Sequence, residues 1–404
     1  MKRTFRHDEY EFGFLIALGS SYRGAADVGE CLSTAGRIKE GNAESWVTQW
    51  LATSERTHEV AESCAAEGHR VSARDAFLRA ATYYSTALYL IDATKDVSRM
   101  LPTWQKHRAC WDRFADLVEP PAERLSIPYE DTTLPGYFFK ADRSGARRPL
   151  LIMNNGSDGP TSSMWGAGGA AALARGYNFM TFDGPGQQSA LLLQNLGFRH
   201  DWENVITPVV DYLLRRPDVD EQRLAIIGVS QGGYWVPRAL AFEHRIAAAV
   251  ADPGVWDVGA QTWFKDLPKG MRKLLDSDEP KARAKFNREL AMVERFSKAL
   301  RARLEFRMRP YRLPTAYDVF KAVLQYRLSG VVDRIACPML ITDPEGEQFW
   351  PGESQVLYDA LRCPKTLIKF TAAEGAGSHC EPAAAGLREQ RIFDWLDEAL
   401  GLSS

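Results

Sequence analysis

The chain has 404 residues, of which 45% are hydrophobic and 25% charged, and its formal net charge at neutral pH is -2. This is the composition of a globular protein large enough for one extensive core and an accessory domain. The near-balance of charge excludes a generally basic surface of the kind that draws proteins to nucleic acid or anionic membranes, and no apolar run approaches the roughly 18 residues of a membrane span.

The N-terminal segment and the cysteines favour a cytoplasmic protein. The basic start turns acidic at once, and the apolar piece at 12–18 lacks a small-residue cleavage site, so we expect no signal peptide. The six cysteines show neither paired spacing nor a zinc pattern, which predicts reduced thiols and no metal. They are Cys31, Cys64, Cys110, Cys337, Cys363 and Cys380. We expect no cofactor.

Residues 1–120 are predicted to form a helical N-terminal accessory domain. A helix-forming run at 44–67 ends at Gly68 and His69, which is typical of a helix stop. Apolar side chains then recur at helical spacing over 72–92, and a third helical segment covers 100–118. Two consecutive prolines at positions 120 and 121 mark the boundary.

Residues 121–404 are predicted to form an α/β domain. Two strands with hairpin-like spacing, at 124–129 and 134–140, precede a very apolar strand at 149–154. Strands and helices then alternate: we expect strands at 178–182, 223–229, 247–251, 338–342 and 366–370, and helices at 170–175, 201–216 and 386–400. Apolar strands alternating with helices predict a mostly parallel sheet covered on both faces.

A helical cap is predicted at about 256–332, between two of these strands. The segment from Lys265 to Arg312 has 15 Lys or Arg against 7 Asp or Glu. An insertion at this point lies over the carboxyl ends of the strands, where α/β proteins bind ligands. Its basic excess is interpreted as a solvated face or a subunit contact, with attraction of an anionic substrate as the alternative.

The strongest functional signal is a Gly-x-Ser-x-Gly sequence, Gly228-Val-Ser230-Gln-Gly232, between an apolar run at 224–227 and a helix-compatible stretch at 234–242. This setting is that of a nucleophile elbow, where glycines flank a serine on a sharp turn because larger side chains would collide. The following helix directs its first N–H groups at the charge that develops during reaction. We predict Ser230 as the nucleophile.

A nucleophilic serine needs a histidine base and an acid that orients the base, in the chain order Ser, acid, His. His379, in a glycine-rich loop after the strand at 366–370, is the one histidine late in the chain. Three carboxylates follow the preceding strand. An ungapped comparison with the usual hydrolase pattern places the acid at Glu347, with Asp343 as the main alternative and Glu345 third.

An oxyanion hole requires two N–H donors. We expect one from Gln231 and the other from the Gly156–Ser157 region, in the loop after the strand at 149–154. Asp183 and the glycines up to Gly186 form a tight turn near the site, which is predicted to tether the structure there. The spacing of these glycines does not fit a dinucleotide fingerprint.

Aromatic residues cluster near the predicted site. We expect Tyr234, Trp235, Trp256 and Trp350 to bind substrate, and Trp165, Trp263 and Phe264 are further candidates, although each alone is equally compatible with the core.

Together, the helical N-terminal part, Asp183-Gly-Pro-Gly, Gly228-Val-Ser-Gln-Gly-Gly, the cap and Ser378-His379-Cys380 resemble the FrsA-like esterase group of the α/β-hydrolase superfamily. Within it the chain is similar to 2,6-dihydroxypseudooxynicotine hydrolase and to fungal polyketide-shortening hydrolases of the Ayg1 type. The resemblance covers nearly the whole chain and is specific from about residue 124 onward. At the acid position the chain departs from the group, with Glu347 in place of aspartate.

This resemblance implies the α/β-hydrolase fold, with an eight-stranded, mostly parallel sheet. It also implies a Ser230–acid–His379 triad that hydrolyses a carbon–carbon bond in a 1,3-dicarbonyl compound, aromatic or polyketide-derived, and it makes a homodimer plausible. Ester or thioester hydrolysis, or cyclisation of a polyketide, would use the same triad. A binding protein without catalysis is the third hypothesis.

Cleavage of a 1,3-dicarbonyl compound expels an enolate, so the site should hold a donor for the second carbonyl oxygen. The polar groups that the sequence offers are Asp252, Asp257, His200 and Tyr234.

Overall fold

The protein is built on one eight-stranded sheet, described here from a computed structural model that covers residues 3–402, except for the side chains of residues 298 and 299. Met1 and Lys2, the start of the segment judged for a signal peptide, lie outside that range. The strands are β1 (Glu123–Tyr129), β2 (Thr132–Phe139), β3 (Arg148–Asn154), β4 (Asn178–Phe182), β5 (Val219–Val229), β6 (Ala248–Asp252), β7 (Met339–Pro344) and β8 (Lys365–Phe370).

The sheet has the order β1-β2-β4-β3-β5-β6-β7-β8. β2 pairs antiparallel with β1 and with β4, and all the remaining pairs are parallel. The predicted α/β-hydrolase fold with a mostly parallel eight-stranded sheet is therefore confirmed. At the centre, Asn154 of β3 lies opposite Gly228 of β5, and Val229 lies opposite Asp252 of β6. The three strands thus end level with one another.

Helices cover both faces of the sheet because its strands are apolar on both sides. One face packs against α8 (Glu203–Leu213), α9 (Gly232–Leu240) and α15 (Glu353–Ala360). The opposite face packs against α6 (Ala170–Ala174) and α16 (Ala385–Ala399), together with two helices from the N-terminal part. Along β3 the side chains alternate between these cores: Leu150 and Ile152 enter the first, Leu151 and Met153 the second.

The N-terminal part consists of α1 (Asp8–Gly19), α2 (Val28–Ala35), α3 (Ala43–Ala66), α4 (Arg70–Leu88) and α5 (Met100–Leu117). Asn42 caps α3 by accepting a hydrogen bond from the Ser45 N–H, and Gly68 ends it in a left-handed conformation. Buried residues of α1–α4 form a small core of their own, while α4 and α5 also pack onto the sheet. Helices α1 and α2 were not predicted from periodicity.

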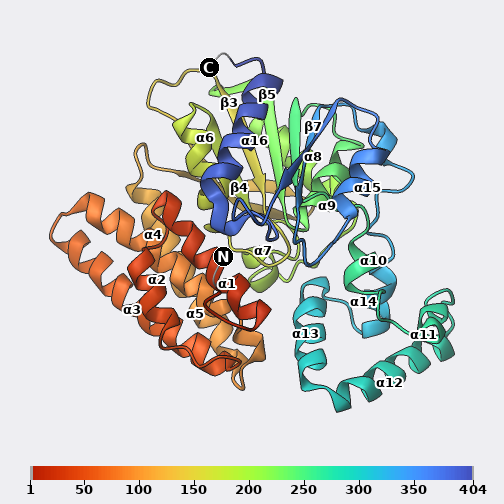
Figure 1. The fold of residues 1–404 in the computed structure, drawn as a ribbon. Helices are drawn as coiled ribbons and strands as arrows, with labels where there is room; N and C mark the ends of the chain where they lie inside the picture. Colours follow the sequence, from red (N-terminus) through yellow and green to blue (C-terminus); the bar gives the residue numbers. More distant parts are fainter. Residues whose placement is uncertain (1–2, 403–404) are drawn as a thin grey trace.

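The segment between β6 and β7 contains α10 (Val258–Thr262), α11 (Lys269–Leu274), α12 (Pro280–Phe296), α13 (Lys298–Met308) and α14 (Ala316–Val323). Figure 1 shows these helices and the N-terminal helices on the same side of the sheet. The two groups meet where Arg309 forms an ion pair with Asp92. The remaining helix, α7 (Gln188–Leu192), follows the turn after β4. No helix in residues 3–402 is both long and apolar enough to cross a membrane.

Helix α1 docks on the loop that carries His379. A Cβ atom added to Gly19 would lie 1.7 Å from the carbonyl oxygen of Pro382, which belongs to that loop's short helical turn. The same helix places Phe12 against the imidazole, with ring centroids 6.0 Å apart. The close approach at Gly19 therefore fixes an N-terminal helix beside a candidate site residue.

We predict that Gly19→Ala pushes α1 away from Pro382 and destabilises the protein by about 1–3 kcal/mol, the usual cost of overpacking. Thermal unfolding measures the change. The control is Gly270→Ala in α11, where an added Cβ meets nothing within 4 Å and helix propensity favours alanine. A Gly19→Ala protein as stable as the control would contradict this account of the docking.

Candidate active site

Ser230 lies at the tip of a sharp turn between β5 and α9, with a left-handed φ of 58°. A Cβ atom on Gly228 would lie 2.2 Å from the carbonyl oxygen of Gly232, and one on Gly232 would lie 2.8 Å from that of Asn154. The Ser230 N–H donates to the carbonyl oxygen of Asp252 at 2.6 Å. The glycines are thus required by close packing, and the serine is held in a strained backbone conformation typical of functional sites.

His379 connects this serine to a carboxylate. Its Nε2 lies 2.8 Å from Ser230 Oγ, and its Nδ1 lies 2.7 Å from Glu347 Oε2. Both His379 and Glu347 are buried. With a proton on Nδ1, the imidazole donates to Glu347 and presents Nε2 as the acceptor for the serine hydroxyl.

Glu347 is arranged to stay ionised. Its other oxygen, Oε1, accepts hydrogen bonds from the N–H groups of Phe349 at 2.8 Å and Trp350 at 3.0 Å. Burial alone would raise the pKa of Glu347, but the charge of His379 and these hydrogen bonds lower it overall. An ionised carboxylate in this position stabilises a protonated imidazole.

The other two carboxylates of this loop do not reach the imidazole. Glu345 Oε2 accepts from the Ala372 N–H at 2.7 Å. Asp343 lies in β7, and neither of the two forms a hydrogen bond with His379 in the described part of the chain. Of the three carboxylates that the sequence offered, the structure therefore brings Glu347 to His379.

The loop after β3 passes directly over Ser230. A Cβ atom on Gly156 would lie 2.7 Å from Ser230 Cβ, so glycine is needed for this approach. The Gly156 N–H, however, already donates to Asn155 Oδ1 at 2.8 Å, which corrects the expectation that it is an open oxyanion donor. Within residues 3–402, the N–H groups of Ser157 and Gln231 donate no hydrogen bond, so these two remain open.

The β3 loop is held in place by Gln187 and Asp183, which both follow β4. Gln187 Nε2 donates to the carbonyl oxygens of Asn155 at 2.8 Å and Gly156 at 2.7 Å. Asp183 is buried and accepts hydrogen bonds from Thr161 and Ser189. The Asp183–Gly186 turn thus has contacts of the tethering kind predicted from the sequence, but Gln187 was missed because nothing in the sequence links it to the β3 loop.

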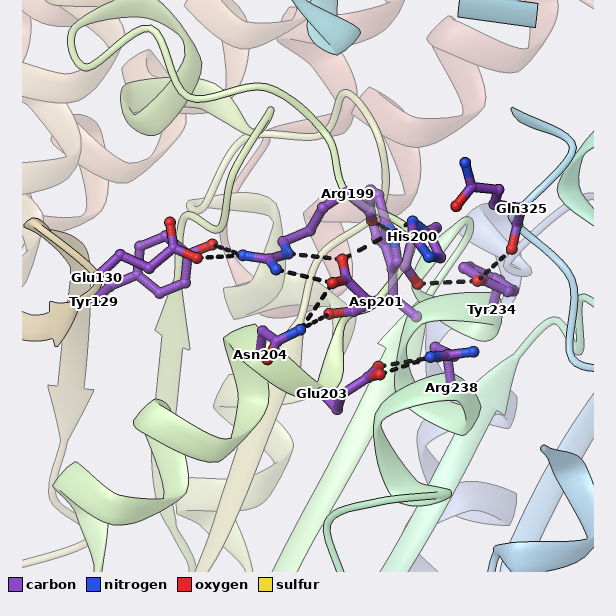
Figure 2. Close-up of polar contacts among 11 residues, drawn as sticks. Tyr129, Glu130, Arg199, His200, Asp201, Glu203, Asn204, Tyr234, Arg238 and Gln325 are labelled. Carbon is purple, nitrogen blue, oxygen red and sulfur yellow. Dashed lines mark hydrogen bonds and ion pairs between the residues drawn. The ribbon is translucent and has the colours of Figure 1, made fainter. Parts of the chain in front are cut away.

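The structure corrects the expectation that Tyr234 and Trp235 line the substrate site. Both side chains are fully buried. Figure 2 shows the Tyr234 hydroxyl bound to the backbone oxygen of His200 at 2.9 Å, beside the ion pairs around Arg199. The Trp235 indole donates to the Arg199 carbonyl and stacks on Trp202. They face away from the site because α9 directs them into the core.

The aromatic groups that do lie near the imidazole come from elsewhere. The rings of Phe349 and Trp350 are 4.7 and 5.7 Å from that of His379, and Phe12 approaches from α1. Trp256 remains partly accessible at the start of the segment before β7. Phe12 was missed because no sequence signal relates the N-terminal helix to the imidazole.

A buried acidic group lies just past His379. Cys380 and Glu381 both have left-handed backbones, with φ of 56° and 45°. The Glu381 side chain is fully buried, and within the described residues no N–H or hydroxyl group donates to either carboxyl oxygen. Burial, followed by the charge of Asp252, raises the pKa of Glu381 well above its usual value. These surroundings favour the neutral form of the Glu381 carboxyl.

A serine on a glycine-flanked elbow, in contact with a histidine at the carboxyl edge of this sheet, defines a serine hydrolase of the α/β-hydrolase class. The family model of the prolyl oligopeptidase family matches residues 199–301. Hydrolase acrC of Aspergillus aculeatus is 30% identical over 98% of this chain and 98% of its own length. The chain therefore belongs to the α/β-hydrolase family that includes this fungal enzyme.

Other relatives agree with this assignment. The 20-hydroxy-prefusarin hydrolase FUS2 of Gibberella moniliformis is 30% identical over 100% of this chain and 99% of its own length. The match to the solved structure of 2,6-dihydroxy-pseudo-oxynicotine hydrolase covers 95% of both chains, with a TM-score of 0.72 and 21% sequence identity. The match to the structure of AbyA5 covers 93% of this chain and 94% of that one, with a TM-score of 0.62 and 17% sequence identity. These two structures share the fold.

We predict that Glu381→Gln changes how stability depends on pH. The folded wild type keeps Glu381 protonated, whereas the unfolded chain ionises above about pH 4.3. Stability contributed by the neutral group is therefore lost as pH rises from that value towards the raised folded-state pKa, by up to about 1.4 kcal/mol per pH unit.

Glutamine cannot ionise, so the variant should gain stability relative to wild type between pH 5 and pH 8. Thermal unfolding of both proteins across this range measures the difference. A stability difference independent of pH would show that Glu381 is already ionised in the folded protein.

Proposed function

We propose that Ser230, His379 and Glu347 form a catalytic triad that hydrolyses a carbon–carbon bond in an aromatic or polyketide-derived 1,3-dicarbonyl compound through an acyl-enzyme. The observation that carries the triad is the continuous chain of hydrogen bonds, 2.8 Å from Ser230 to His379 and 2.7 Å from His379 to Glu347. Both distances are within the range that proton transfer and orientation require.

In this mechanism His379 Nε2 takes the proton of Ser230 as Oγ adds to a carbonyl carbon. The oxyanion is held by the open N–H groups of Gln231 and Ser157, the first of which lies at the N-terminus of α9. Collapse of this adduct breaks the carbon–carbon bond, and the electron pair is delocalised onto the second carbonyl oxygen as an enolate. Water then attacks the acyl-enzyme with His379 as the base.

The relatives support a small organic substrate. One is named for the hydrolysis of 20-hydroxy-prefusarin, and the solved structure with a similar fold is that of a 2,6-dihydroxy-pseudo-oxynicotine hydrolase. Aromatic rings around the imidazole, from Phe12, Phe349 and Trp350, provide apolar contacts for such a molecule.

Hydrolysis of an ester or thioester, or cyclisation of a polyketide, is the second candidate, because it needs the same nucleophile and oxyanion donors. The reactions are distinguished by the leaving group, since an alkoxide or thiolate needs no second carbonyl. The two-domain division, the cap at about 256–332, the homodimer and the cytoplasmic location stay predictions.

We predict that Ser230→Ala abolishes turnover and removes labelling by a fluorophosphonate, because the nucleophile is gone. Intact-mass analysis of wild type should show one adduct that maps to Ser230, and hydrolysis of matched 1,3-diketone and ester substrates gives the rates. Ser230→Ala with full turnover of both substrates would contradict the assignment of the nucleophile.

We predict that Glu347→Gln lowers kcat by about 10²- to 10⁴-fold, because an amide neither stabilises the protonated imidazole nor fixes its tautomer. The matched control is Asp343→Asn, which should keep kcat within about threefold of wild type because Asp343 forms no hydrogen bond with His379 in the described residues. Steady-state kinetics measures both. Loss of activity in the Asp343 variant alone would transfer the acid's role to that residue.

A further inference from the structure

The loop after β3 carries a carboxyl group whose position is fixed relative to Ser230. Asp158 follows Gly156, the residue in contact with Ser230, by two positions. Its own carbonyl oxygen accepts from Gln188 Nε2 at 2.8 Å, while Gln187 holds the carbonyls of residues 155 and 156. Since two residues span at most about 7 Å, the Asp158 backbone lies within that distance of Gly156, which itself contacts Ser230.

The carboxyl group of Asp158 forms one hydrogen bond in the described residues. Ser157 Oγ lies 3.0 Å from Asp158 Oδ1 and donates to it. No Lys or Arg side chain in the described part of the chain approaches within ion-pair distance, and Oδ2 has no partner there. The side chain is also exposed to solvent. One oxygen is thus free to meet a ligand.

This exposed side chain is nevertheless surrounded by protein. Burial raises the pKa of Asp158, although the Ser157 hydroxyl and the charges of His379 and Arg309 oppose that effect. The charged and titratable groups that face it come from every neighbouring part: Tyr89 after α4, Asp92 in the next turn, Arg307 of α13, Arg309 of the turn after α13, and His379. The Asp158 side chain is therefore accessible although protein groups surround it, and the charge of His379 acts on it.

Three of the four polar groups that the sequence suggested for the second carbonyl, all except the His200 ring, are otherwise engaged. Asp252 is buried and accepts from Thr342 Oγ1 at 2.7 Å, and Asp257 caps α10. The buried Tyr234 hydroxyl donates to the backbone oxygen of His200. None of these three carboxyl and hydroxyl groups presents a free donor.

We propose that Asp158, as a neutral carboxylic acid, is the group that donates to the second carbonyl oxygen of the 1,3-dicarbonyl substrate and protonates the departing enolate. This rests on the proposed function. The Ser157 hydroxyl opposes the raised pKa, but its hydrogen bond to Oδ1 orients the carboxyl group and leaves Oδ2 to carry the proton. An accessible acid whose pKa is raised by desolvation is suited to give a proton to a substrate.

The proton and bond changes balance. Ser230 Oγ bonds to the first carbonyl carbon and its proton passes to His379. The carbon–carbon bond then breaks, and the enolate oxygen takes the Asp158 proton to give an enol. The enol becomes a ketone when protonated His379 gives its proton to carbon and the enol O–H returns its own to Asp158. Both groups are then ready for hydrolysis of the acyl-enzyme by water.

The test compares carbon–carbon and ester cleavage in Asp158→Asn and Asp158→Ala. With 1-phenyl-1,3-butanedione as the diketone, we expect kcat to fall about 10²-fold or more, the usual contribution of a general acid. Hydrolysis of 4-nitrophenyl acetate and fluorophosphonate labelling of Ser230 should stay within about threefold of wild type, because a nitrophenolate leaves without protonation. Asp343→Asn is the control for loss of a nearby carboxylate.

A second readout separates chemistry from structure. The 4-nitrophenyl analogue of the diketone gives a more stable enolate, so the Asp158→Asn defect should shrink with it. The rate of diketone cleavage by wild type should also fall as pH rises through the elevated pKa of Asp158. The pH–rate profile of Asp158→Asn should lack this fall.

The outcomes are distinct. Equal losses for ester and diketone, or no loss for the diketone, would overturn the role of Asp158 while leaving the triad intact. A wild-type enzyme that hydrolyses the ester but neither diketone would overturn the proposed carbon–carbon function itself, and this inference with it.

Discussion

The hydrogen-bonded chain from Ser230 through His379 to Glu347 is the interaction on which the arrangement of the site depends. Its three members follow β5, β8 and β7, and parallel pairing brings the ends of these strands to one edge of the sheet. Each connection is short, so a small displacement of any strand end would lengthen it. The glycines that flank Ser230, and Gly156 above it, permit the close approach that holds the serine in reach.

The helices at the N-terminus contribute to the same site. Helix α1 contacts the His379 loop through Gly19 and places Phe12 against the imidazole. From the other direction, Arg309 joins the segment before β7 to Asp92. Two sets of helices thus lie beside the sheet edge and also meet each other (Figure 1). This arrangement is what desolvates the charged groups around the nucleophile.

Three carboxyl groups near Ser230 illustrate how surroundings assign different states to one functional group. Glu347 accepts two backbone N–H bonds and faces the imidazole, which lowers its pKa. Glu381 accepts no backbone N–H bond and has no histidine partner. It is fully buried beside Asp252, so its pKa is raised. The pKa of Asp158 is raised too, but its side chain is accessible rather than buried. Separation of pKa values in this way is how one site provides both an ionised and a neutral acid.

The sequence by itself determined the sheet, the elbow and the late histidine, because these depend on local patterns: apolar strands, glycines two residues from a serine, and chain order. The tertiary structure alone decided the remainder. The sequence placed Glu347 first among three carboxylates in one loop, but its contact with His379 depends on how that loop packs. Which side of α9 faces the core depends on what packs against that helix. Tyr234 and Trp235 lie on that side and are therefore buried rather than open to a substrate. Phe12 reaches His379 across more than 360 residues of chain, and contacts between such distant segments leave no local signal because their geometry is set by the whole fold.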